Sequence, residues 1–161
     1  MKLAALFATV RREVACEIVM KLLGAVDDQR WIQPFVWGLL TIYDAEADVE
    51  IPDITGDDDI SASTTMIAVP VLHGADVEIP EDTDPNEPIP PAQVTVTVVG
   101  RELDTPAEFT GQLDCPSGRL AIGDLENKRV AHVPTGTLLV DIQREPRKFT
   151  EHVTLSIRSS G

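Results

Sequence analysis

The sequence predicts a mainly β protein: an antiparallel β-sandwich or barrel with an N-terminal α-helix packed on it. From residue 35 onward, short segments alternate apolar and polar residues, and Pro/Gly turns separate them at intervals of about 8–12 residues. Before residue 24 the apolar residues instead recur every three or four positions. At 161 residues, with 43% hydrophobic and 25% charged, we expect one domain over 1–161, with the helix within 1–30 and the sandwich over 35–161.

The N-terminal helix is expected over residues 3–23. Its apolar positions form one stripe: Leu3, Phe7, Val10, Val14, Ile18 and Leu22. Gly24 is a typical helix stop. Residues 14–23 also fit an alternation of apolar and polar residues with a period of two, which is typical of a half-buried strand. The length of the apolar pattern favours the helix. The apolar run is short and Arg11 and Arg12 follow it at once, so we expect no cleaved signal peptide.

The strands follow in order along the rest of the chain. They are expected within residues 35–44, 63–74, 92–100, 108–115, 119–125, 135–143 and 149–159. Val94, Val96 and Val98 alternate with threonines and should face the core. Pro70 restricts its segment to an edge strand or a bulge, because proline cannot donate to a ladder.

Two acidic loops interrupt the strands. Residues 44–63 contain Pro52 and Gly56, and residues 80–91 contain five prolines and four acidic residues. The second loop cannot form a core element, so we expect it to be extended and exposed.

A short repeat marks two turns. "CPSGRLAI" (115–122) and "VPTGTLLV" (133–140) share proline and glycine, followed by an apolar run. Proline presets φ in a turn and glycine accepts a positive φ, so both copies should be tight turns. We expect the first copy to join 109–115 to 119–124 as a hairpin, and the second copy to form the same kind of turn before the strand over 137–143.

The charge is concentrated in one segment. The net charge is −14, and residues 44–108 contain 17 acidic side chains and one basic one, whereas the flanking segments are nearly neutral. This disfavours nucleic acid and anionic membranes as partners, since both require cations on the protein. A basic protein partner is favoured. The two cysteines, Cys16 and Cys115, make no disulfide framework, which indicates a reducing, cytoplasmic compartment.

No catalytic residue and no cofactor are predicted. Cys115 precedes proline, so it does not stand at the N-terminus of a helix that would activate it. Ser117 does not lie in the G-x-S-x-G turn between a strand and a helix that carries the nucleophile of a hydrolase. The histidines have no metal-binding spacing: His73, His132 and His152 lie on three different segments.

The candidate site residues are therefore ones that bind a partner. They are the acidic side chains of the two loops and two exposed aromatic candidates: Asp57, Asp58, Asp59, Glu81, Asp82, Asp84, Glu87, Trp31 and Trp37. A core patch is the favoured interpretation of the aromatics. A calcium site at Asp53, Asp57 and Asp59 is the weaker alternative, because the EF-hand pattern fails at Asp58 and Thr64.

Three stretches resemble a known family: "FVWGLLTIYDAE", "CPSGRLAIGD" and "VPTGTLLVDI". They are similar to the β-sandwich proteins related to competence protein J, the inhibitor of the DNA-entry nuclease, and to bacterial immunity proteins. The resemblance covers roughly half of the chain and implies a binding or inhibitory protein. It carries over no individual functional residue.

Two functions of different classes follow. The first is a non-enzymatic acidic protein that neutralises a basic partner, such as a nuclease toxin, as an immunity protein or inhibitor does. The alternative is a structural or assembly module of a phage or secretion system. Such a module would self-associate as a homo-oligomer through the helix and the aromatic patch between Trp31 and Tyr43.

Overall fold

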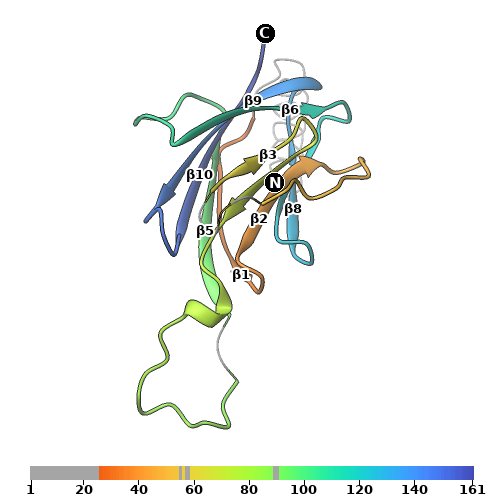
Figure 1. Cartoon of the computed structure of the whole chain (residues 1–161). Coiled ribbons are helices and arrows are strands. Elements are labelled where there is room, and N and C mark those ends of the chain that lie inside the picture. The colour runs from red at the N-terminus through yellow and green to blue at the C-terminus, as the bar shows by residue number, and fades with distance from the viewer. Residues whose placement is uncertain (1–25, 55, 57–58, 89–90) are drawn as a thin grey trace, which may run out of the picture.

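The computed structural model describes residues 26–54, 56, 59–88 and 91–161 (Figure 1). These ranges form ten strands and one short 3₁₀ turn, η1 (Gly74–Asp76). The strands are β1 (Gln29–Phe35), β2 (Leu39–Asp44), β3 (Ser61–Ala62), β4 (Met66–Pro70), β5 (Ala92–Val99), β6 (Phe109–Cys115), β7 (Arg119–Gly123), β8 (Lys128–His132), β9 (Gly136–Glu145) and β10 (His152–Ser159). The predicted helix over 3–23 lies outside the described residues.

The strands form two sheets that pack face to face. The first has the order β1-β5-β10-β9-β6 and the second has the order β3-β4-β2-β7-β8. Apolar side chains from both sheets form one core cluster, with Phe35, Leu155 and Ile157 from the first sheet and Leu40 and Ile122 from the second among its members. Within the described ranges neither sheet closes on itself, so the fold is a sandwich and not a barrel.

One strand pair corrects the prediction of an antiparallel sandwich. β10 runs parallel to β5, with His152 opposite Thr95 and Ser156 opposite Val99. The other strand pairs of the described residues are antiparallel. A parallel pair requires a long connection. Here the chain passes through β6 to β9, in both sheets, before it returns beside β5.

The predicted alternation is confirmed on β5 and β10. Val94, Val96 and Val98 are fully buried. On β10, Val153, Leu155 and Ile157 are at most 1% exposed. Each such side chain contributes about 1.5–3 kcal/mol on burial, so these two strands hold the centre of the first sheet in place.

Several strands differ from the prediction in their bounds or were not predicted. β1 begins at Gln29, within the range assigned to the helix, and a turn at Gly38 divides residues 35–44 into two strands. Gly38 has φ of 64°, and a Cβ there would lie 2.9 Å from Cβ of His73. β8 (Lys128–His132) was not predicted, because it is an edge strand in which only Ala131 is buried. Its sequence therefore lacks the alternation that marks a half-buried strand.

The two Pro-Ser/Thr-Gly turns are sheet-crossing corners and not hairpins. The first connects β6 in the first sheet to β7 in the second, and the second returns the chain from β8 to β9. Gly118, with φ of 68°, brings the two corners together: its N–H donates to the Cys115 carbonyl at 3.2 Å, and its carbonyl accepts the Val133 N–H at 3.0 Å. A Cβ at this position would lie 3.0 Å from Cγ2 of Thr135. The prediction of a tight turn is confirmed for the first copy only, because the second copy is a bend at Thr135 that leads directly into β9 at Gly136, where φ is 106°.

The two acidic loops leave the second sheet at opposite ends. β2 runs from Leu39, opposite Pro70, to Asp44, opposite Leu120. Residues 45–60 follow the Asp44 end, whereas residues 71–91 follow the Pro70 end. Figure 1 shows residues 77–88 extending far from the sheets, at the end opposite the C-terminus. Of the predicted loop 80–91, the described residues 80–88 are exposed apart from the half-buried Thr83, as expected.

Candidate protein-interaction site

Asp44 is a buried carboxylate that holds the first corner in place. It is 1% exposed and accepts hydrogen bonds from the Ser117 N–H at 2.8 Å, the Ser117 hydroxyl at 2.7 Å and the Glu46 N–H at 2.8 Å. Burial alone would raise the pKa of Asp44, but the hydrogen bonds from Ser117 and Glu46 outweigh burial and hold the pKa below its ordinary value. Asp44 is therefore an ionised structural group.

Cys115 is a buried core residue whose surroundings disfavour the thiolate. Its side chain is fully buried, and burial together with the negative charge of Asp44 raises the pKa of the Cys115 thiol to about 11. A nucleophilic cysteine needs the opposite environment, one that favours the thiolate. The structure therefore agrees with the interpretation of Cys115 as a small apolar residue of the core.

Ser117 and the histidines also form no catalytic or metal arrangement in the described residues. The Ser117 hydroxyl contacts Asp44 and the Arg119 carbonyl, with no imidazole among its partners. His73 accepts the Ala75 N–H on Nδ1 at 2.9 Å and so caps η1. Over the described ranges, no three His, Cys, Asp or Glu side chains gather as a metal site would require. Those ranges also contain no helix of the length and apolarity that crossing a membrane demands.

The calcium alternative and part of the acidic site stay predictions. Asp57 and Asp58 lie outside the described residues, whereas Asp53 and Asp59 are exposed in the connection after β2. Asp53, Asp57 and Asp59 are therefore not tested as a set.

The two candidate tryptophans have different environments. Trp31 is 5% exposed, donates from its indole N–H to Gln33 at 2.7 Å, and has the Arg129 guanidinium 5.2 Å from its ring centroid. This burial corrects the prediction of Trp31 as a partner-binding residue, because its ring is already covered. Trp37 is 65% exposed, since it lies in the turn between β1 and β2. Of the two, only Trp37 offers its ring to a partner.

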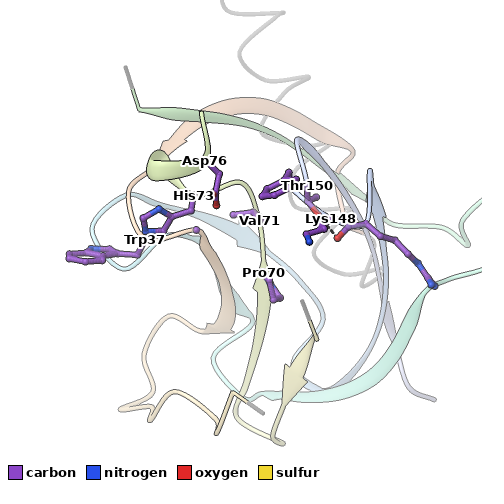
Figure 2. Close-up of a pocket in the computed structure, with 10 residues that line it drawn as sticks. Trp37, Pro70, Val71, His73, Asp76, Lys148 and Thr150 are labelled. Atoms are coloured by element: carbon purple, nitrogen blue, oxygen red, sulfur yellow. Dashed lines mark hydrogen bonds between the residues drawn. The ribbon is translucent and has the colours of Figure 1, made fainter. Parts of the chain in front are cut away.

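Trp37 borders a hollow of about 420 Å³ at the Pro70 end of the sandwich, which we term the Trp37 hollow. Its lining comes from three connections: Trp37 and Gly38; Pro70, Val71, His73 and Asp76; and Arg147, Lys148, Phe149 and Thr150. Figure 2 shows the Trp37 indole pointing outward, away from the other lining residues, and Asp76 directing its carboxylate inward.

A second hollow of about 480 Å³ adjoins the first, and we term it the Phe149 hollow. It shares Asp76 and Phe149 with the Trp37 hollow and is lined by Leu72, Asp76, Val77, Glu78, Phe149 and Glu151. Phe149 is 50% exposed. Together the two hollows present two exposed aromatic rings, Trp37 and Phe149, directly beside the start of the second acidic loop.

Hydrogen bonds hold the Phe149 segment in position. Thr150 is 1% exposed, and its hydroxyl donates to the Pro146 carbonyl at 2.8 Å. The Leu72 N–H donates to the Thr150 carbonyl at 2.9 Å, and the Thr95 N–H donates to the Glu151 carbonyl at 2.8 Å. Phe149 itself has φ of 54°, a conformation that is rare for a bulky residue. The surrounding bonds therefore hold an aromatic ring at the surface in a strained backbone.

Sequence reasoning did not identify Phe149 as a site residue. It was expected as the first residue of a strand over 149–159, but β10 begins at His152. Pro146 and the basic pair Arg147 and Lys148, just before it, were the local signal of a connection. Only the tertiary structure brings this connection beside Asp76 and Trp37.

Comparisons with known proteins identify the architecture. No family model matches the chain, and no curated protein sequence matches it. Among solved structures, the crystal structure of ComJ from Bacillus subtilis, described as the inhibitor of the DNA degrading activity of NucA, matches with a TM-score of 0.53. The chain resembles ComJ in fold. The match covers 83% of this chain and 98% of ComJ at 10% identity.

A second solved structure, described as crocagin biosynthetic gene J, matches with a TM-score of 0.46 at 13% identity. This match covers 82% of the present chain and 97% of the other. The resemblance to competence protein J inferred from three short stretches is thus confirmed at the level of fold.

Proposed function

We propose that this chain is a non-enzymatic acidic binding protein that inhibits a basic protein partner by covering its functional surface. One observation carries the proposal: residues 76–87 contain six acidic side chains and no basic one, and they begin beside exposed Trp37 and Phe149. Across the described residues, none of these six carboxylates is paired with a base.

This arrangement suits a basic partner for two physical reasons. Unpaired carboxylates on an exposed loop attract cations over a distance and speed the encounter. Exposed aromatic rings then supply the desolvated contacts that dominate affinity at most interfaces. Neither contribution requires a catalytic group.

A nuclease is the partner class that we favour. A protein that binds the phosphate backbone presents Lys and Arg side chains on its surface. ComJ, which shares this fold, is described as an inhibitor of a nuclease activity. In the present chain, the acidic loop would occupy the cations that otherwise hold phosphate. We propose the cytoplasm as the compartment, because Cys115 is a free thiol.

The proposal assigns binding to the Pro70 end of the sandwich. Glu81, Asp82, Asp84 and Glu87 lie on the loop at this end, whereas Asp59 belongs to the connection at the opposite end. Asp57 and Asp58 belong to that same connection in sequence, so we assign them a smaller part in binding the partner.

The test is calorimetric titration of a candidate basic nuclease over a salt series. We expect affinity to fall steeply with salt, and to fall at least tenfold in the variant Glu81→Gln, Asp82→Asn, Asp84→Asn, Glu87→Gln. The matched control removes four charges at the other end: Asp48→Asn, Glu50→Gln, Asp53→Asn, Asp59→Asn. Affinity that ignores salt would refute the electrostatic mechanism, and equal losses in both variants would refute the assignment to the Pro70 end.

The assembly alternative loses part of its expected contact surface. Of the aromatic patch between Trp31 and Tyr43, Trp31, Phe35 and Tyr43 are at most 7% exposed, which leaves Trp37 as its exposed ring. The other expected contact, the N-terminal helix, lies outside the described residues. Homo-oligomerisation remains a prediction that light scattering at high protein concentration would test.

A further inference from the structure

We infer that the Phe149 hollow receives the side chain of an arginine on the partner protein. This inference deepens the proposed function and rests on it, because it names the group that the acidic end of the sandwich recognises. The occupant is argued from the chemistry of the walls, from the pairing of the carboxylates and from the rigidity of the site.

The walls of the Phe149 hollow combine two kinds of surface. Leu72, Val77 and Phe149 are apolar, and the acidic residues Asp76, Glu78 and Glu151 complete the lining. An arginine side chain has the matching composition, with an apolar stem and a planar cation at its end. The guanidinium can pair with carboxylates in two-point geometry and stack on an aromatic face, which a lysine ammonium does less well.

Among the described residues, the three acidic side chains of the hollow have no ion-pair partner, unlike several acidic side chains elsewhere in the sandwich. In the described part of the chain, Glu108 pairs with Arg144, Asp141 with Arg158, and Glu46 with Arg119. Asp76, Glu78 and Glu151 have no such base within the same ranges.

Two basic residues of the described part of the chain line the neighbouring Trp37 hollow but not the Phe149 hollow. Lys148 and Arg147 line the Trp37 hollow, and Arg147 also lies 3.5 Å from Glu108. Lys148 Nζ is 5.4 Å from the Phe149 ring centroid, so this ring already has a cation beside it. Among the described residues, no base lines the Phe149 hollow itself, so a guanidinium from a partner would complement its acidic side chains.

The hollow is already formed without an occupant. The hydrogen bonds from Thr95, from Leu72 and within the connection 146–150 hold Phe149 and Glu151 in position. A volume of about 480 Å³ accommodates a side chain together with part of its backbone. Binding therefore requires little ordering of the receptor, which favours recognition of a single side chain.

The test uses short capped peptides and backbone-amide NMR of the full chain. The probes are Ac-Gly-Arg-Gly-NH₂, its lysine counterpart and its citrulline counterpart, which keeps the shape of arginine without the charge. We expect the arginine peptide to shift amides of 72–78 and 149–151 and to bind more tightly than lysine, with no binding of citrulline. The double variant E78Q/E151Q should weaken the arginine peptide at least fivefold, whereas the control E126Q, at another turn, should not.

The outcomes separate this inference from the proposed function. Shifts elsewhere, equal binding of citrulline, or equal binding of lysine would overturn the assignment of the hollow to arginine. If E78Q/E151Q loses the peptide but binds the basic partner unchanged, the inference fails and the proposed function stands. If no basic protein binds but the arginine peptide does, the proposed function fails, and the hollow remains a guanidinium receptor.

Discussion

At the scale of single residues, Asp44 shows how a buried charge can be structural. Its carboxylate accepts three hydrogen bonds from Ser117 and Glu46 and so ties β2 to the corner between the two sheets. Replacing a hydrogen-bonded buried group costs about 1–3 kcal/mol when its partners are left unsatisfied. If asparagine replaced Asp44, its side-chain NH₂ group would face one of the three groups that now donate to the carboxylate, and that hydrogen bond would be lost.

We therefore expect Asp44→Asn to lower the free energy of unfolding at pH 7 by about 1–3 kcal/mol. Because the folded pKa of Asp44 is depressed, its contribution is present above its unfolded pKa of about 3.9 and is lost as the pH falls below this value. The free energy of unfolding, measured with urea, should fall less between pH 7 and pH 3 in the variant than in the wild type. The control D114N, at an exposed position, should change little; equal pH dependence in wild type and D44N would contradict this account.

Cys115 should react slowly with alkylating agents. With a thiol pKa of about 11, roughly one molecule in a thousand is thiolate at pH 8, against about a quarter for a free peptide thiol. We expect modification more than about a hundredfold slower than that of a peptide. Peptide mapping by mass spectrometry separates Cys115 from Cys16. A rate equal to that of a free peptide would revive the enzymatic interpretation.

A substitution at Phe149 should change binding of the arginine peptide with little change in stability. Its φ of 54° suits asparagine better than phenylalanine, and its ring is half exposed. We expect Phe149→Asn to keep the unfolding free energy within about 1 kcal/mol, because relief of strain offsets the lost burial. The same variant should weaken the arginine peptide at least fivefold. The control W37A, which changes only the neighbouring hollow, should leave peptide binding intact; a similar loss in both variants would contradict the assignment to the Phe149 hollow.

At the scale of elements, Arg144 forms a largely buried ion pair within the first sheet and a hydrogen bond to the second sheet. Arg144 on β9 is 8% exposed, pairs with Glu108 at 2.5 Å, and donates to the Pro70 carbonyl of β4 at 3.3 Å. Such a pair contributes less than its geometry suggests, since both charges lose water. Removal of one partner alone is costly, because the remaining charge stays buried.

Glu108→Ala should therefore lower the unfolding free energy by about 3 kcal/mol, as expected for a buried cation that loses its counter-ion. The double variant Glu108→Leu, Arg144→Met should cost less than the single one, because it removes both charges and keeps apolar volume. Chemical denaturation at pH 7 compares the two. A double variant less stable than E108A would show that the pair contributes to stability beyond avoiding an unpaired charge.

The corners at Pro116 and Pro134 show why a local pattern can predict a turn but not its destination. Proline and glycine specify the backbone angles of both turns. A hairpin and a sheet-crossing corner can share those angles, so the pairing partner decides between them. Here β6 pairs with β9 and not with β7, and the buried Leu113 lies opposite the buried Leu138 in the first sheet.

At the scale of the whole molecule, the hydrophobic core and the proposed binding surface lie in different parts of the chain. The core lies between the sheets, whereas residues 80–88 are almost entirely exposed beyond the Pro70 end. Replacement of 80–88 by a Ser-Gly segment of equal length should change the unfolding free energy by less than about 1 kcal/mol. It should reduce affinity for the basic partner at least tenfold. A large loss of stability would instead indicate that this loop packs on the sheets.

The sequence by itself determined the alternation of β5 and β10, the exposed proline-rich loop and the acidic middle of the chain. These follow from local composition and period, which are properties of neighbouring residues. Only the tertiary structure decided the parallel pairing of β5 with β10, the edge strand β8, the burial of Trp31 and the meeting of Phe149, Asp76 and Trp37. Each of these depends on contacts between residues far apart in the chain, which no local pattern encodes.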